Sequence, residues 1–241
     1  MIGQVVLNSN IMSVNLGLGV VLVVQDGVAK VSGLIGVRSG ELVKFKKCGV
    51  DGIVIGLLKD SVSVTILGSD REVQQGELVE RLYEVVKVPV GYELLGRVVD
   101  GIGNQADNKE LPIELMEKAL VEVKAPGVIT RQPVREPLAT GILALDSIVP
   151  VGRGQRQLII GDRQTGKTVV ALDTIINQRT NQRPVICVYV AIGQKRSTVS
   201  QIAARLKQEG AAPYTIIVAA TASESAALQY LAPYTATAIA E

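Results

Sequence analysis

The stretch from Gln157 to Val170, QLIIGDRQTGKTVV, places a glycine-rich loop between two apolar runs. Its centre, GDRQTGKT, fits the pattern G-x-x-x-x-G-K-[ST] without a mismatch. The pattern predicts a strand at Leu158–Ile160, a loop whose backbone N–H groups form an anion cradle, and a helix that begins near Lys167. A glycine-rich turn that binds nothing is the alternative interpretation. The match favours a nucleotide phosphate site.

The composition excludes several other kinds of site. The chain has 241 residues, a net charge of +2, 47% hydrophobic residues and 20% charged residues, which is typical of one or two ordinary globular domains. It contains no histidine, so a histidine base and a histidine metal ligand are both excluded. Aromatic residues make up 3% of the chain, which counts against a surface that stacks nucleic-acid bases. The two cysteines, Cys48 and Cys187, are expected to be reduced thiols.

Residues 1–16 form an uncharged N-terminal segment, and the first charged side chain is Asp26. Six polar residues interrupt the apolar ones between positions 4 and 15, so we do not expect a membrane span. A signal peptide is not expected either, because there is no basic region at the start.

Residues 17–88 are predicted to form a small β-barrel domain. Short runs such as SVSVTIL alternate apolar and polar residues, and glycine-containing turns recur between them. Closure into a barrel would leave no free sheet edge. Gln25-Asp26-Gly27 and Ser69-Asp70 are interpreted as turns of this domain rather than as binding residues.

Residues 89–241 are predicted to form a parallel α/β domain that carries the glycine-rich loop. A long irregular connection with a short helix or two is expected from Asn104 to Pro137, and a further short helix around Leu143–Ile148. Strands and helices then alternate, which favours a parallel sheet with helices on both faces and a ligand at the carboxyl ends of the strands. The expected elements are a helix at 167–179, a strand at 185–192, a helix at 198–209, a strand at 215–219 and a helix at 222–230.

Two absences favour nucleotide binding over nucleotide hydrolysis. Hydrolases with such a loop use a carboxylate at the end of a second apolar strand to hold Mg²⁺. No aspartate follows Asp173, and the only later acids are Glu209, Glu224 and Glu241. The run that ends at Ile192 is followed by Gln194, whose amide binds phosphate or water but does not accept a proton. We therefore predict no catalytic residue in this chain.

Five stretches carry a resemblance to a known family: VPVGYELLGRVVDGIGN, GRGQRQLIIGDRQTGKT, VAIGQKRSTV, TASESAALQYLAPYT and, within the second, GDRQTGKT. They resemble the α subunits of F-type ATP synthases from about Gly17 to the end of the chain. The resemblance implies a β-barrel followed by a RecA-like P-loop domain that is incomplete at its C-terminus. It also implies a non-catalytic site for ATP or ADP with Mg²⁺, with Thr168 on the metal and Gln194 near the γ-phosphate. The nucleotide-binding residues would be Gly161, Asp162, Arg163, Gln164, Thr165, Gly166, Lys167, Thr168 and Gln194.

The same resemblance implies partners. The chain would alternate with β subunits in a hexamer around a central γ stalk, contact a peripheral stalk subunit, and reach the membrane only through the complex. The family's α subunits are about twice as long, so we expect either a complementary C-terminal α fragment or a truncation. We expect the mitochondrial inner membrane, on the matrix side, with a bacterial plasma membrane or a chloroplast thylakoid as alternatives.

The sequence is also compatible with two other functions. A hexameric RNA-translocating ATPase of the transcription-termination type has a similar layout, but would need a basic, aromatic-bearing barrel and a catalytic carboxylate. An autonomous ATPase would need turnover by the isolated chain. We expect neither nucleic-acid binding nor such turnover.

Overall fold

The computed structural model of the chain describes residues 17–107, 113, 116–181 and 183–241. The uncharged segment 1–16 therefore lies outside the described residues. The structure divides into two compact units, one that extends to Lys87 and one that begins at Val88, with Ser223–Tyr230 grouped with the first.

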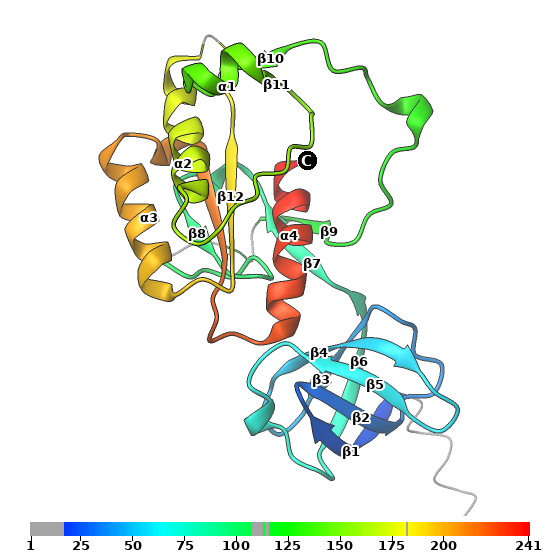
Figure 1. Cartoon of the computed structure of the whole chain (residues 1–241). Coiled ribbons are helices and arrows are strands. Elements are labelled where there is room, and N and C mark those ends of the chain that lie inside the picture. The colour runs from blue at the N-terminus through cyan, green and yellow to red at the C-terminus, as the bar shows by residue number, and fades with distance from the viewer. Residues whose placement is uncertain (1–16, 108–112, 114–115, 182) are drawn as a thin grey trace, which may run out of the picture. The chain divides into compact units, whose positions relative to one another are not determined.

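The first unit is a closed six-stranded barrel with the strand order β1-β2-β5-β4-β3-β6 (Figure 1). All of its strand pairs are antiparallel. Its strands are β1 (Leu18–Gln25), β2 (Val28–Gly33), β3 (Glu41–Phe45), β4 (Asp51–Leu57), β5 (Val62–Ile66) and β6 (Leu78–Val85), with a 3-10 turn, η1 (Asp70–Glu72), between β5 and β6. The predicted barrel is confirmed.

The alternation of the sequence determines which side chains fill the barrel. In β5, Val62, Val64 and Ile66 are buried while Ser63 and Thr65 are partly exposed. The β1–β2 hairpin turns at Asp26 and Gly27, whose φ angles of 50° and 77° are those that a tight two-residue turn requires. The single phenylalanine, Phe45, is fully buried among the valines of the barrel core.

A buried ion pair joins β3 to β6 within the barrel wall. The guanidinium of Arg81 donates to both carboxylate oxygens of Glu41, at 2.7 and 2.9 Å, and to the carbonyl oxygen of Ile35 at 2.8 Å. The guanidinium also lies over the ring of Tyr83, at 4.4 Å from its centre. The hydrogen bonds from Arg81 hold the pKa of Glu41 below its ordinary value, against the opposing effect of burial.

This lowered pKa predicts that the barrel loses stability in acid. A carboxyl group whose pKa is lower in the folded state than in the unfolded state stabilises the fold above the unfolded pKa, near 4.5, and loses this contribution as the pH falls through the folded pKa. We expect the urea-unfolding free energy to fall less steeply between about pH 6 and pH 3 in Glu41→Gln than in the unaltered chain. Glu80→Gln, which alters an exposed pair with Lys46, is the matched control and should keep the full slope. Equal slopes for all three proteins would contradict the assignment.

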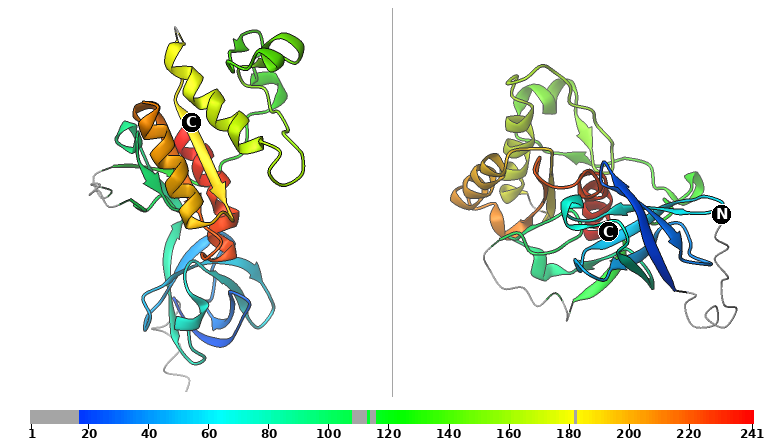
Figure 2. Two further views of the ribbon diagram at one scale, coloured as in Figure 1. Left: turned by 60° about the vertical axis from the view of Figure 1, so that its left-hand side comes forward. Right: turned by 90° about the horizontal axis from the view of Figure 1, so that it is seen from below.

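The second unit is built on a three-stranded parallel sheet with the order β12-β13-β8. The helices α2 and α3 pack on one face, against Cys187, Tyr189 and Ala191, and the second half of α4 packs on the other, against Val188 and Val190 (Figures 1 and 2). All six residues of β13 are buried. The predicted parallel α/β architecture is therefore confirmed.

The elements of this unit have the following bounds. The strands are β7 (Lys87–Val90), β8 (Val98–Val99), β9 (Glu117–Leu120), β10 (Pro137–Leu138), β11 (Val151–Gly152), β12 (Cys187–Ile192) and β13 (Thr215–Ala220). The helices are α1 (Leu143–Ile148), α2 (Lys167–Asn177), α3 (Arg196–Gln208) and α4 (Ala226–Ala240). The 3-10 turns are η2 (Tyr92–Leu94), η4 (Val128–Thr130), η5 (Gln178–Thr180) and η6 (Ala212–Tyr214). No helix in these described ranges is long and apolar enough to span a membrane.

Three expectations for this unit are wrong. Leu158–Ile160 is not a strand, because no described strand pairs with it. The connection before Pro137 contains a strand, β9, which pairs with β7. The last helix begins at Ala226 and continues to Ala240 through Pro233, beyond the expected end at Tyr230. Thr235 and Thr237 in its second half hydrogen-bond to the carbonyl oxygens of Gly101 and Pro233, at 2.6 and 2.8 Å.

Candidate functional site

The glycine-rich loop occupies residues 161–166 and leads directly into α2. Gly166 precedes the helix with φ at 88°, and Gln164 also has a positive φ of 63°, so two of the three residues before the helix are in the left-handed region. Only glycine adopts the first of these conformations without strain. At Gly161 a side chain would come within 2.8 Å of the Thr165 hydroxyl, which would have to move.

The backbone N–H groups of this segment are unused. Across residues 161–169, no backbone N–H donates a hydrogen bond to any described residue. The first hydrogen bond of the helix runs from the N–H of Val170 to the carbonyl oxygen of Gly166, at 3.0 Å. Successive free N–H groups at the positive end of an eleven-residue helix form an anion-binding arrangement.

The side chain of Lys167 hydrogen-bonds to the loop that precedes it. Its ammonium donates to the carbonyl oxygen of Gly161 at 2.5 Å, to that of Asp162, and to the Thr165 hydroxyl at 3.4 Å. The Thr165 hydroxyl donates in turn to the Asp162 carbonyl oxygen at 2.9 Å. These contacts place a positive charge beside the free N–H groups.

Thr168 lies in the first turn of α2, exposed, and its hydroxyl makes no hydrogen bond to a described residue. It is therefore available to a ligand. The side chains of Asp162 and Arg163 are likewise exposed and have no hydrogen-bond partner among the described residues. Within the described ranges, no three cysteine, aspartate or glutamate side chains gather where a metal ion could be held.

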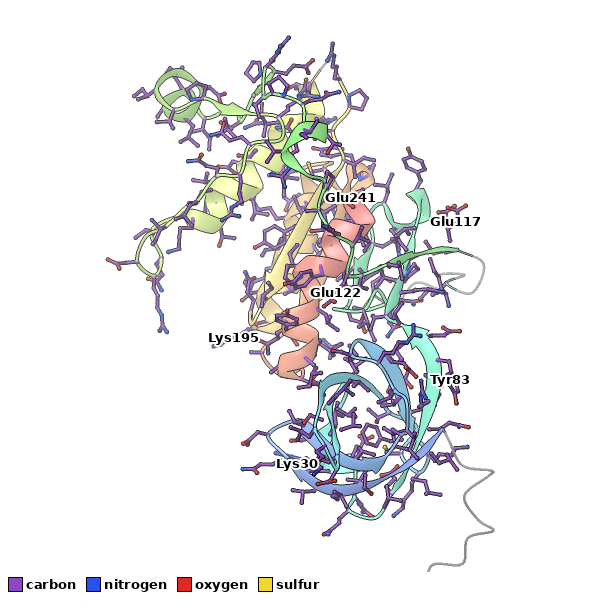
Figure 3. All side chains as sticks on the ribbon, turned by 90° about the vertical axis from the view of Figure 1, so that its right-hand side faces the viewer. Lys30, Tyr83, Glu117, Glu122, Lys195 and Glu241 are labelled. Carbon is purple, nitrogen blue, oxygen red and sulfur yellow. The ribbon has the colours of Figure 1, made fainter. Side chains whose placement is uncertain are left out.

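Gln194 follows β12, immediately before Lys195 at the turn into α3 (Figure 3). Its side-chain Nε2 donates to the hydroxyl of Tyr189 at 3.3 Å, and its Oε1 is buried with no hydrogen-bond partner. Its backbone carbonyl accepts from the N–H of Ala222 at 3.1 Å. Tyr189 was not identified from the sequence, in which it stands as one more large side chain in an apolar strand.

The topology brings the loop and Gln194 to the same end of the sheet. The hydroxyl of Tyr214, directly before β13, donates to the carbonyl oxygens of Ile175 and Ile176 at 3.1 and 3.2 Å. The C-terminal end of α2 therefore lies at the amino ends of the strands, and its N-terminus lies toward their carboxyl ends, where Gln194 is. No hydrogen bond joins Gln194 to a residue of the loop.

Cys187, on the same sheet face as Tyr189, is a free thiol. Burial raises its pKa to about 11. Because the thiolate is the reactive form, this cysteine is unsuited to act as a nucleophile at neutral pH.

Comparisons with known proteins agree with this arrangement. The sequence model for the ATP synthase alpha/beta family, nucleotide-binding domain, matches residues 141–241, and that for the same family's beta-barrel domain matches residues 17–83. A protein of Rickettsia canadensis (strain McKiel), named ATP synthase subunit alpha, is 56% identical over 240 residues, which are 97% of this chain and 46% of the relative. A protein of the same name from Jannaschia sp. (strain CCS1) is 53% identical over 231 residues, covering 92% of this chain and 45% of the relative. The chain thus spans about half the length of these relatives.

Proposed function

The chain belongs to the ATP synthase alpha/beta family, and from this premise we propose that it is a non-catalytic, Mg-ATP-binding α subunit of the F1 sector of a proton-translocating ATP synthase, or the N-terminal fragment of a split α subunit. We assign residues 17–88 to its barrel domain and residues 89–241 to its nucleotide-binding domain. The names of the relatives favour this function over an RNA-translocating ATPase.

The observation that carries the proposal is the set of free N–H groups over residues 161–169, with the Lys167 ammonium beside them. ATP or ADP presents a run of negatively charged phosphate oxygens that accept from such groups. Gly161–Thr168 would bind these oxygens, and Lys167 would exchange its loop carbonyls for the β- and γ-phosphates.

Thr168 would hold the magnesium ion that accompanies the nucleotide. Its exposed, unbonded hydroxyl at the start of α2 fits this role. No aspartate follows Asp173 within residues 1–241, so a carboxylate of the magnesium shell would come from outside these residues. Bound Mg²⁺ would neutralise phosphate charge and fix the phosphate geometry.

Gln194 supports the non-catalytic part of the proposal. Its amide at the carboxyl end of β12 donates to a phosphate oxygen or orients a water, but it takes up no proton from an attacking water. The chain would therefore retain nucleotide and influence its neighbours rather than turn the nucleotide over.

The exposed apolar groups of the second unit support a complementary C-terminal α fragment as partner. Leu158, Ile159 and Ile160 are 76%, 49% and 84% exposed, in a segment that pairs with no described strand. β12 is paired on one side only within the described sheet. A second polypeptide that adds strands here would cover both features, which otherwise favour aggregation.

The remaining partners follow from family membership. We propose that the chain alternates with β subunits in a hexamer around a central γ stalk and contacts a peripheral stalk subunit. It would be peripheral to the membrane. The bacterial relatives fit a plasma membrane, and the mitochondrial inner membrane, on its matrix side, is our more specific proposal.

Native mass spectrometry of the complex purified from its source tests this function. We expect three copies of this chain, three of a second α-like chain and three β subunits, with nucleotide bound. A complex without this chain would contradict the proposal, and this chain alone with no complementary fragment would contradict the split subunit.

A further inference from the structure

One end of the barrel exposes a group of large apolar side chains. The strand registers bring the ends of β2, β4 and β6 together there, beside the start of β1. Six side chains in these strand ends and the loops that follow them are between 45% and 67% exposed, and we call them the apolar end: Ile35, Ile55, Leu57, Leu58, Tyr83 and Val85. β4 and β6 are both neighbours of β3, so about 10 Å separates them and one short segment could cover both. Exposed apolar groups that gather in this way are typical of an interaction site.

Tyr83 has the most unusual conformation of the six. It lies on the outside of β6 (Figure 3), and its φ of 57° is in the left-handed region, which bulky residues rarely adopt. The Arg81 guanidinium lies over its ring at 4.4 Å and donates to the carbonyl oxygen of Ile35 at 2.8 Å, so Tyr83 and Ile35 are held beside the same group. A strained backbone that leaves an aromatic ring exposed indicates a binding contact.

Residues 1–16 join the barrel beside Tyr83. A Cβ at Gly17, the residue that follows them, would come within 2.8 Å of the Tyr83 hydroxyl. The carbonyl oxygen of Gly17 also accepts from the backbone N–H of Arg81 at 2.9 Å. Residues 1–16 carry no charged side chain, and nine of them are hydrophobic. Sixteen residues span up to about 50 Å, so this segment can reach every side chain of the apolar end.

We propose that residues 1–16 of this chain dock on the apolar end of the barrel, with the ring of Tyr83 as their first contact. The covalent link at Gly17 makes docking intramolecular, which gives the segment a high effective concentration at this surface. The segment has no charge that docking would remove from water, while Lys59, Asp60 and Glu84 are exposed around the contact and can keep their hydration. The proposal does not depend on the nucleotide site, so either can fail without the other.

Hydrogen exchange tests the proposal on the full chain and on a chain that lacks residues 2–14. We expect the amides of residues 57–61 and 83–86 to exchange about tenfold more slowly in the full chain, because covering even one large apolar side chain contributes enough free energy for that difference. The amides of residues 68–76, at the opposite end of the barrel, should exchange at the same rate in both chains.

Two variants of the full chain locate the contact. Leu58→Asp places a charge within the apolar end, at a side chain that is already 55% exposed, and should abolish the slowing. Val23→Asp is the matched control, because Val23 is 50% exposed on β1 toward the opposite end of the barrel, and it should leave the slowing unchanged. Protection of the β5 amides in both variants checks that the barrel stays folded.

Three results would overturn the proposal. The first is equal exchange in the full and the shortened chain. The second is slowing that survives in Leu58→Asp. The third is slowing that grows with protein concentration, which would mean that a second copy of the chain, rather than residues 1–16, covers the apolar end.

Discussion

Lys167→Ala is expected to remove detectable ATP binding while both units keep their folds. Among the described residues, this ammonium is the only cationic group hydrogen-bonded to the loop backbone, and its loss removes the positive charge beside the free N–H groups. A charge-assisted hydrogen bond contributes about 1.5–3 kcal/mol, and Lys167 would make two to the phosphates, so the loss in affinity is roughly 100-fold or more. Calorimetric titration with ATP and Mg²⁺ measures it.

The control for this substitution is Lys207→Ala in the last turn of α3, which removes an exposed lysine with no partner among the described residues. It should bind ATP as the unaltered chain does. Hydrogen exchange of the barrel amides in Lys167→Ala should also be unchanged, since the loop lies in the other unit. Stoichiometric ATP retained by Lys167→Ala would show that the site is assigned to the wrong residues.

Arg81→Ala is expected to cost the barrel about 3–5 kcal/mol of unfolding free energy. The side chains of Arg81 and Glu41 are 10% and 7% exposed, so removing the guanidinium leaves a buried carboxylate without its partner. It also removes the hydrogen bond to Ile35 and the stacking on Tyr83. Urea unfolding followed by hydrogen exchange at the amides of β3 and β6 measures the loss in the unit concerned.

Two further variants separate the charge from the packing. Lys46→Ala removes half of a pair with Glu80 whose side chains are 47% and 45% exposed, and we expect about 0–1 kcal/mol from it. Arg81→Met combined with Glu41→Leu replaces the buried pair with apolar groups, and should recover most of the stability lost in Arg81→Ala. An Arg81→Ala barrel as stable as the Lys46→Ala barrel would contradict the argument.

The sequence predicts those parts of the fold that depend on local pattern. The alternation in β5 and the Asp26-Gly27 turn indicate the barrel, and the apolar run before Gln194 indicates β12. The Glu41–Arg81 pair could not be found in this way, because forty residues separate its members and only the barrel closure joins their strands. The same limit explains the missing strand at Leu158–Ile160, since an apolar run becomes a strand only where another strand pairs with it.

The residues of the candidate site also fall into two groups, those that a local sequence motif predicts and those that only the structure reveals. The loop residues Gly161–Thr168 follow from one contiguous motif, and the structure supplies the free N–H groups that the motif predicts. The partnership of Tyr189 with Gln194 depends on how far a phenol extends along a strand toward its carboxyl end. The sequence alone does not show that the hydroxyl of a tyrosine within an apolar run lies beside the side chain of a residue five positions later.

The bonds of Lys167 to its own loop have a consequence for which anions the cradle accepts. An incoming anion competes with the Gly161 and Asp162 carbonyl oxygens for the ammonium, so binding is an exchange of partners rather than a simple addition. A singly charged, weakly accepting ion such as chloride would not compensate for the loss of the hydrogen bonds to those carbonyl oxygens. A polyphosphate offers several charged oxygens at once. The resting loop is therefore expected to favour polyphosphates over singly charged, weakly accepting anions such as chloride.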